Sequence, residues 1–256
     1  MAMGPRLHVP ADRLQIDGQT FALDDGPSRH IQVLRLQPGD TVQLFDGLGQ
    51  EWAARVEEMG RKVVQVRITE AVNNDRELPA RVTLALGMPT NDRMDTLVEK
   101  ATELGAHAIQ PLICTRSVLR LDGERAAKKV AHWQAVAVAA AEQCGRAVVP
   151  VVHPIQALPA WLKALHDAPD AVSRRGVLSL RDAVPMSVWL AQASPHPDQV
   201  WCFLSGPEGG LTEEEEALAR AAGWDCVSLG RRVLRADTAP LAALSVIGAR
   251  LEGLQG

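Results

Sequence analysis

The sequence contains no tyrosine, and aromatic residues make up only 4% of its 256 residues. A surface of stacked aromatic side chains, of the kind that binds single-stranded RNA, is therefore not expected. A strong excess of one charge is also missing, because 27 Lys and Arg residues face 31 Asp and Glu residues, for a formal net charge of -4. This balance excludes a protein that holds nucleic acid by bulk positive charge, although it leaves room for a local basic patch.

Cysteine pairs, long apolar runs and nucleotide-binding motifs are absent too. The four cysteines lie far apart and none forms a CxxC pair, so we expect no metal site and predict a reduced, cytoplasmic location. The longest Ala/Val run, Ala135–Ala141, is too short to cross a bilayer, and no membrane contact is expected. Neither GxGxxG nor GxxxxGK[ST] occurs, so dinucleotide and nucleoside-triphosphate binding lose their main support.

Short apolar stretches separated by Gly and Pro turns fill the first part of the chain. The strands expected there are Ile31–Arg35, Thr41–Phe45, Glu51–Glu57 and Val63–Thr69. Several short strands at this spacing predict a small β-barrel. The polar segment Asn73–Glu77 is typical of a linker. We therefore predict a first domain over residues 1–75 and a second over residues 76–256.

After Pro79 the pattern changes to alternating strands and helices. The expected strands are Val82–Gly87, His107–Ile113, Val148–Val152, Gly176–Leu180, Val200–Ser205 and Trp224–Leu229. The expected helices are 94–104, 124–144, Leu158–His166, Val184–Ala193, Glu213–Ala222 and a last helix with Leu241, Leu244, Ile247 and Leu251 on one face. This order predicts an α/β domain with a mainly parallel sheet covered on both faces. The loops that leave the carboxyl ends of such strands build the site.

One such loop is Ser205–Leu211, with the sequence SGPEGGL. Its glycines permit positive φ and a close approach of the backbone to a ligand. Thr212 and Glu215 form a Thr-x-x-Glu capping box, so the loop is equally interpreted as a tight turn that starts a helix. The acidic run Glu213–Glu216 is expected to be the solvated start of that helix.

The other loop follows the strand Trp224–Leu229 and contains Arg231, Arg232 and Arg235. Guanidinium groups bind phosphate bidentately, so the cluster either faces phosphate or is solubilising charge. Asp237 or Thr238 is expected to cap the last helix, whose apolar face belongs to the core or to an oligomer interface.

The segments GPEGGLTEEE and LGRRVLRADTA resemble two C-terminal motifs of the SPOUT superfamily of methyltransferases, and specifically its ribosomal RNA small subunit methyltransferase E family. Other blocks are similar to the family in the same order, and they are His30–Arg35, Glu99–Gly105, Thr115–Ser117 and Glu142–Arg146. The chain departs from the family pattern at Thr90, where Lys is common, and at Ala236-Asp237, which replaces a Thr-Glu pair. The ordered set covers nearly the whole chain.

The resemblance implies an N-terminal PUA-like barrel for RNA contact and a C-terminal α/β domain with a deep trefoil knot. It also implies S-adenosyl-L-methionine as cofactor and a homodimer with the site at the subunit interface. The implied reaction is methylation of N3 of a uridine in 16S rRNA, within the assembled small ribosomal subunit. The implied cofactor contacts are Leu180, Ser205, Gly206, Gly210, Leu229, Gly230, Val233 and Leu234.

N3 of uracil carries a weakly acidic proton that must leave, so the reaction needs a base or a cation that favours the deprotonated ring. Arg235 is the candidate for the cation or for a phosphate anchor, and Glu208 and Asp237 are candidates for the base. The expected RNA contacts are Arg6, His30, Arg35, Arg116, Arg146, Arg231 and Arg232.

Three other functions stay open at this point. A SPOUT enzyme that methylates a ribose 2′-hydroxyl would share the same motifs. A non-catalytic RNA-binding protein of ribosome assembly would keep the fold without the chemistry. A nucleotide-dependent dehydrogenase is disfavoured, because the sequence has no GxGxxG.

Overall fold

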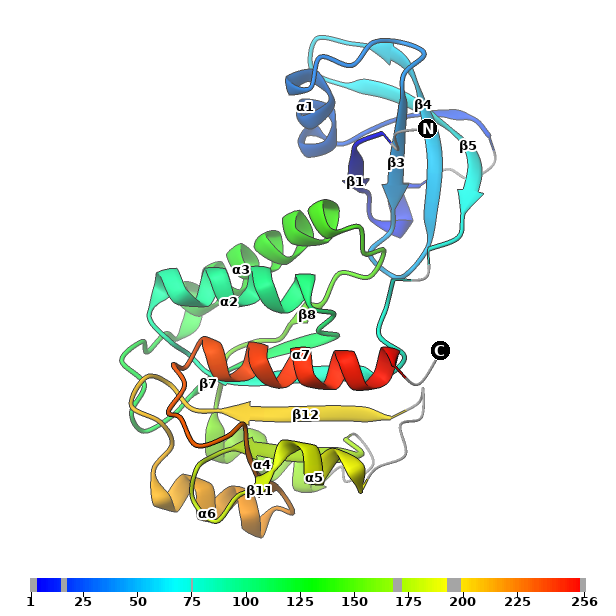
Figure 1. Cartoon of the computed structure of the whole chain (residues 1–256). Helices are drawn as coiled ribbons and strands as arrows, with labels where there is room; N and C mark the ends of the chain where they lie inside the picture. Colours follow the sequence, from blue (N-terminus) through cyan, green and yellow to red (C-terminus); the bar gives the residue numbers. More distant parts are fainter. Residues whose placement is uncertain (1–3, 15–17, 75, 168–171, 193–198, 254–256) are drawn as a thin grey trace. The chain divides into compact units, whose positions relative to one another are not determined.

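The computed structural model describes residues 4–14, 18–74, 76–167, 172–192 and 199–253. The chain divides into two compact units (Figure 1). The first unit contains Met1–Glu77 and also Val138–Val149, and the second contains Leu78–Ala137 and Pro150–Gly256. Asp75, at the end of the first predicted domain, and Ala193, at the end of the predicted helix Val184–Ala193, lie outside the described residues.

The first unit is built on a mixed five-stranded sheet. Its strands, in spatial order, are β1 (Arg6–His8), β3 (Thr41–Phe45), β4 (Glu51–Met59), β5 (Val64–Val72) and β2 (Thr20–Ala22). β1 runs parallel to β3, and the other neighbours are antiparallel. A short 3-10 helix, η1 (Ala11–Arg13), lies between β1 and β2 in the chain. The expected strands over 41–45, 51–57 and 63–69 are thus present. β1 and β2 were not predicted, because three residues are too few to show the alternation of apolar and polar side chains that marks a strand.

The expected strand Ile31–Arg35 is wrong, because this segment lies in helix α1 (Asp25–Val33) and the turn after it. Pro27 falls in the first turn, where its fixed φ suits a helix. Ile31 is fully buried in the core of the first unit, whereas Val33 is 70% exposed. Ser28, three residues before Ile31, is also fully buried, so the buried face has helical spacing. Because Ser28 is polar, the sequence shows only the apolar residues Ile31, Val33 and Leu34, which imitate a strand.

The second unit contains a sheet in which every strand pairing is parallel. In spatial order its strands are β11 (Val184–Pro185), β13 (Asp225–Ser228), β10 (Arg174–Leu178), β12 (Val200–Ser205), β6 (Arg81–Gly87), β7 (Ala108–Ile113) and β8 (Val151–Val152), with β9 (Gln156–Ala157) also paired to β7. The helices are α2 (Asn91–Glu103), α3 (Gly123–Cys144), α4 (Leu158–Asp167), α5 (Met186–Ala191), α6 (Glu213–Ala221) and α7 (Thr238–Glu252). The last residues of α3, from Val138 onward, belong to the first unit. The predicted parallel α/β architecture is confirmed.

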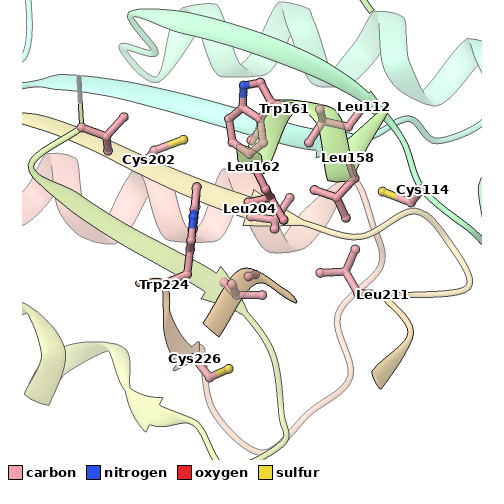
Figure 2. Close-up of a cluster of buried hydrophobic side chains, with 14 residues drawn as sticks. Leu112, Cys114, Leu158, Trp161, Leu162, Cys202, Leu204, Leu211, Trp224 and Cys226 are labelled. Carbon is pink, nitrogen blue, oxygen red and sulfur yellow. The ribbon is translucent and has the colours of Figure 1, made fainter. Parts of the chain in front are cut away.

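The central strand β12 is buried on both of its faces. Cys202 and Leu204 belong to an apolar cluster beneath α4 (Figure 2). On the opposite face, Trp201 and Phe203 contact Trp189 of α5, with ring centroids 5.5 and 5.7 Å apart. Burial on both faces explains why β12 reads as a continuous apolar run rather than an alternating one.

The last helix, α7, packs along β12 and β6 (Figure 1). Leu244, Ile247 and Leu251 are buried, so most of the predicted apolar face belongs to the core of the second unit. No helix in the described part of the chain is long and apolar enough to cross a membrane.

Candidate functional site

A cavity of about 310 Å³ opens where β10, β12 and β13 end. These strands are neighbours and parallel, so their carboxyl ends meet at one edge of the sheet. The residues that line the cavity come from the ends of β10 and β13, from the loops after the three strands, and from Arg116, Glu216 and Ala239. Two of these loops are the segments that the sequence singles out, and we call them the glycine loop (Ser205–Leu211) and the arginine loop (Leu229–Asp237). The folded chain therefore brings the two motifs together at one cavity.

The glycine loop is a closed turn that its own backbone holds. The Gly210 amide donates to the Pro207 carbonyl at 2.8 Å, and Gly210 has φ +69°. A Cβ on Gly206 would lie 2.6 Å from the Leu211 nitrogen, so any side chain there would collide with backbone. The end of β6 comes equally close, because a Cβ on Gly87 would lie 2.5 Å from Cδ of Pro207. Glycine is therefore required at positions 87 and 206 for the loop to fold over the sheet.

Glu215 fixes the end of the glycine loop. The predicted capping box is confirmed: Thr212 Oγ1 accepts from the Glu215 amide at 3.2 Å, and Glu215 Oε2 accepts from the Thr212 amide at 2.9 Å. The other carboxylate oxygen of Glu215 accepts from the backbone amide and the hydroxyl of Thr115, at 2.7 and 3.0 Å. One buried side chain therefore joins the start of α6 to the loop after β7.

Glu208, a candidate base, is exposed in the glycine loop and accepts a hydrogen bond from the Thr90 amide at 2.9 Å. Partial burial alone raises the pKa of its carboxyl group. This effect is outweighed by hydrogen bonds from the Thr90 backbone and side chain and from the amide of Glu208 itself, together with the positive charge of Arg93. These interactions hold the pKa below its ordinary value. A carboxylate with a lowered pKa is a weaker base, so this environment disfavours proton abstraction by Glu208.

The arginine loop is open by comparison. It leaves β13 through a turn in which the Gly230 amide donates to Ser228 Oγ at 3.1 Å, with Gly230 at φ +113°. The side chains of Arg231, Arg232 and Arg235 are exposed, and their guanidinium groups have no hydrogen-bond or ion-pair partner in the described part of the chain. The loop therefore presents three uncompensated positive charges next to the cavity.

Asp237 ends the arginine loop at the N-cap position of α7, but its side chain makes no capping hydrogen bond. The first-turn amides of Thr238 and Ala239 instead point to the Arg235 carbonyl, each at 3.0 Å. The expected capping role of Asp237 is thus not seen. Its Oδ1 atom is buried without a hydrogen-bond partner among the described residues, which is a costly state for a carboxylate.

Most of the predicted cofactor contacts line the cavity together. They are Leu180, Gly206, Gly210, Leu229, Val233 and Leu234. Ser205 and Gly230 are not among the lining residues, although each is the neighbour of one in sequence. Leu180 and Val233 are 52% and 85% exposed, so the mouth of the cavity is apolar and uncovered in the single chain. The candidates Arg235, Glu208 and Asp237 lie on the two loops but not in the lining.

Of the expected RNA contacts in the second unit, Arg116 and Arg232 line the cavity, whereas Arg231 does not. Arg116 crosses to the glycine loop, where Nη1 donates to the Gly209 carbonyl at 2.8 Å. It is exposed, as are Arg231 and Arg232, so a basic rim adjoins the apolar mouth.

Arg6 and Arg146, expected as RNA contacts, are instead buried in the first unit. Arg6 forms a two-pronged ion pair with Glu51, with contacts of 3.2 and 2.9 Å, and its side chain is 8% exposed. Arg146 is 3% exposed and pairs with Glu77. Their donors are used inside the unit, so these two residues differ from the expectation and hold the fold together.

His30 and Arg35 remain accessible on the first unit. The His30 ring lies 4.0 Å from a Glu142 carboxylate oxygen and is 42% exposed. Arg35 is exposed and has φ +55°, an uncommon conformation for a residue with a side chain, at the turn that follows α1.

Three polar residues of the lining were not predicted from the sequence as site residues: Ser179, Arg181 and Glu216. Glu215 and Glu216 are only 6% and 5% exposed, so the expectation that Glu213–Glu216 is wholly solvated is wrong for these two. Helical phase was the available signal, because both lie about one turn before the buried Ala219. Because all four residues are glutamate, their charges alone do not show which of them face the core.

Comparison with known proteins assigns both units. Residues 76–248 match the RNA methyltransferase domain, and residues 23–69 match the RNA methyltransferase PUA domain. A curated relative, ribosomal RNA small subunit methyltransferase E of Bacillus subtilis, is 35% identical over 260 residues, which covers 98% of each chain. The chain belongs to the ribosomal RNA small subunit methyltransferase E family.

Other members of the ribosomal RNA small subunit methyltransferase E family agree with this assignment. The Synechocystis member is 36% identical over 93% of this chain and 76% of its own. The crystal structure of the Neisseria gonorrhoeae member bound to S-adenosyl methionine superposes with a TM-score of 0.86, at 38% identity, and covers 96% of this chain and 98% of that one. Both cavity loops lie inside the matched methyltransferase domain.

Proposed function

We propose that the chain transfers a methyl group from S-adenosylmethionine to N3 of a uridine in the rRNA of the small ribosomal subunit. The observation that carries the proposal is the single cavity that the glycine loop and the arginine loop line together. Support comes from membership of the family and from the relative whose structure holds S-adenosyl methionine.

The residues of the cavity fit that cofactor. Its volume, about 310 Å³, is that of a small-molecule site. Leu229, Leu234 and Val227 provide apolar walls for an adenine ring, and the glycine loop brings backbone amides and carbonyls within reach of polar edges. A buried carboxylate, that of Glu216, suits the positive charge of the cofactor. When bound, S-adenosylmethionine supplies an activated methyl group.

The chain itself must orient the uracil and dispose of its N3 proton. Holding the attacking nitrogen in line supplies much of the rate, because it removes the entropy cost of the encounter. Arg235 is exposed beside the cavity and has no partner among the described residues, so it is free to favour the deprotonated ring or to anchor a phosphate. Asp237, with one unpaired buried oxygen, suits the base better than Glu208, whose carboxylate is already bonded to Thr90.

RNA contact is proposed for both units. Arg116, Arg231 and Arg232 form the basic rim of the cavity, and His30 and Arg35 are accessible on the first unit. We propose that the first domain, residues 1–75, is a PUA-like barrel that binds RNA. The match to the PUA domain supports this proposal. By family analogy, the substrate is rRNA in the assembled small subunit.

A trefoil knot and a homodimer complete the proposal. The knot is supported by the path of α7, which follows β13 but packs on β12 and β6, on the far side of β10. The dimer, with the site at its interface, is supported by the exposed apolar side chains of Leu180 and Val233 at the mouth of the cavity. Light scattering of the purified chain measures the oligomeric state, and a monomer at micromolar concentration would contradict the dimer.

The test of the proposed reaction uses small ribosomal subunits from cells that lack this protein. Incubation of these subunits with the purified chain and S-adenosylmethionine is expected to add one methyl group, which nucleoside analysis then identifies as N3-methyluridine. A ribose-methylated nucleoside would instead identify a 2′-O-methyltransferase. Saturable RNA binding without methyl transfer would identify a non-catalytic assembly protein.

A further inference from the structure

Glu216 is the buried acid of the cavity. It lies in the first turn of α6, is 5% exposed and lines the cavity. The other charged residues of the lining, Arg116, Arg181 and Arg232, are all exposed cations. A single carboxylate thus lies deep in a site whose remaining charged groups are positive and close to solvent.

The two oxygens of Glu216 are in different states. Oε1 accepts a hydrogen bond from Ser179 Oγ at 3.1 Å, and the same hydroxyl accepts from the Arg181 amide at 3.0 Å, so the serine is fixed from both sides. Oε2 is buried without a hydrogen-bond partner among the described residues, and a half-exposed guanidinium, that of Arg220, lies 3.8 Å away. The carboxylate is therefore oriented, but its charge is only partly compensated.

A buried carboxylate in this state is destabilising unless a cation completes its surroundings. S-adenosylmethionine carries two cationic centres, the sulfonium and the α-ammonium. The α-ammonium and the carboxylate of the cofactor are attached to the same carbon atom. The exposed arginines of the lining carry the charge that would bind that carboxylate. The sulfonium has no N–H to donate and needs only negative charge nearby, which Glu216 supplies through Oε2, an atom with no hydrogen-bond partner among the described residues and only a distant ion pair to Arg220.

We propose that Glu216 is a specificity-determining residue that faces the sulfonium and makes the cavity prefer the charged methyl donor over its neutral product, S-adenosylhomocysteine. This inference rests on the proposed function. Methyl transfer removes the positive charge from sulfur, so the product loses the attraction of Glu216 while it keeps every other contact. The same side chain that favours donor binding thus favours product release.

The test is calorimetric binding of three ligands to the wild-type chain and to Glu216→Gln. S-adenosylmethionine carries a positive charge on sulfur, and sinefungin carries an ammonium group in place of the transferred methyl group. S-adenosylhomocysteine is neutral there, and all three ligands have the α-ammonium. Loss of the carboxylate is expected to weaken the two cationic ligands about tenfold and the neutral one less than about twofold. Glu214→Gln removes an exposed charge from the same helical turn and is the matched control, with unchanged affinities.

Equal weakening of all three ligands would overturn the inference, because it would place the α-ammonium or a purely structural role at Glu216. Unchanged affinities would also overturn it. If Glu216→Gln does not fold, as judged by its thermal unfolding, Ser179→Ala takes its place. That variant keeps the carboxylate but frees Oε1, and it is expected to reduce the preference for cationic ligands about twofold to threefold. A wild-type chain that binds no S-adenosylmethionine would instead refute the proposed function itself.

Discussion

The two loops that enclose the cavity differ in how far each satisfies its own polar groups. The glycine loop is closed by a backbone hydrogen bond, a complete capping box and a glycine, Gly206, at which any side chain would collide with backbone. The arginine loop has three exposed guanidinium groups and one buried carboxylate oxygen without partners in the described part of the chain. The first is therefore a preformed wall, and the second is a surface whose charged groups lack partners in the described part of the chain. Substitutions in either loop test this contrast.

Gly206→Ala is expected to have the largest effect, because it breaks the preformed wall. The new Cβ would lie 2.6 Å from the Leu211 nitrogen, so we expect a loss of about 2–3 kcal/mol in the free energy of unfolding, together with weaker S-adenosylmethionine binding. Gly230→Ala in the arginine loop is the control. Its Cβ would meet nothing within 4 Å, so only the strain of φ +113° applies, at about 1 kcal/mol. Denaturant unfolding measures both, and equal losses would contradict the contrast.

Arg235→Ala is expected to lower the rate of rRNA methylation about a hundredfold, because the arginine loop would lose the charge assigned to the reacting uracil. The free energy of unfolding and the affinity for S-adenosylmethionine are expected to stay unchanged, since the side chain is exposed and lies outside the cavity lining. Single-turnover methylation and calorimetry provide the two readouts. Near-normal methylation by this variant would remove Arg235 from the mechanism.

Arg231→Ala tests whether the exposed charge of the arginine loop contacts phosphate. We expect RNA affinity to fall about threefold and the dependence of log affinity on log salt concentration to become shallower by about 0.7, the value for one phosphate contact on a single strand. Arg250, an equally exposed arginine near the other end of α7, is the matched control, and its replacement by Ala is expected to change neither quantity. An unchanged salt dependence in Arg231→Ala would show that this arginine is only solubilising charge.

Glu208→Gln is expected to have the smallest effect on the free energy of unfolding, and this effect depends on pH. The folded chain holds the pKa of Glu208 below its ordinary value of 4.5. Between the lowered pKa and about pH 4.5, the folded state therefore binds fewer protons than the unfolded state. The ionised carboxylate therefore stabilises the fold fully above about pH 4.5 and progressively less as the pH falls. The difference in unfolding free energy between wild type and variant should shrink over the same range. A difference that grows on acidification would contradict this sign.

The sequence predicts the second unit well because its architecture follows from apolar periodicity. Continuous apolar runs such as Val200–Ser205 bury both faces of a strand, and the strand-end rule then locates both loops. In the first unit, the apolar pattern of Ile31–Arg35 predicted a strand in place of α1, because the buried face of this helix consists of Ile31 and the polar residue Ser28.

Side-chain environment is the part that the sequence does not reveal. Arg6 and Arg231 are the same residue type, yet one is paired with a buried glutamate from a distant strand and the other is exposed. Glu213 and Glu216 likewise differ only in helical phase, and only the second reaches the cavity. Such differences depend on contacts between residues far apart in the chain, which no local pattern encodes.

The most direct test of the central claim is a crystal structure of the chain with S-adenosylmethionine at saturating concentration. The account predicts electron density for the methyl donor between the glycine loop and the arginine loop, with the sulfur next to Glu216. Density at another place, or an empty cavity in crystals of a chain that binds the donor in solution, would contradict it.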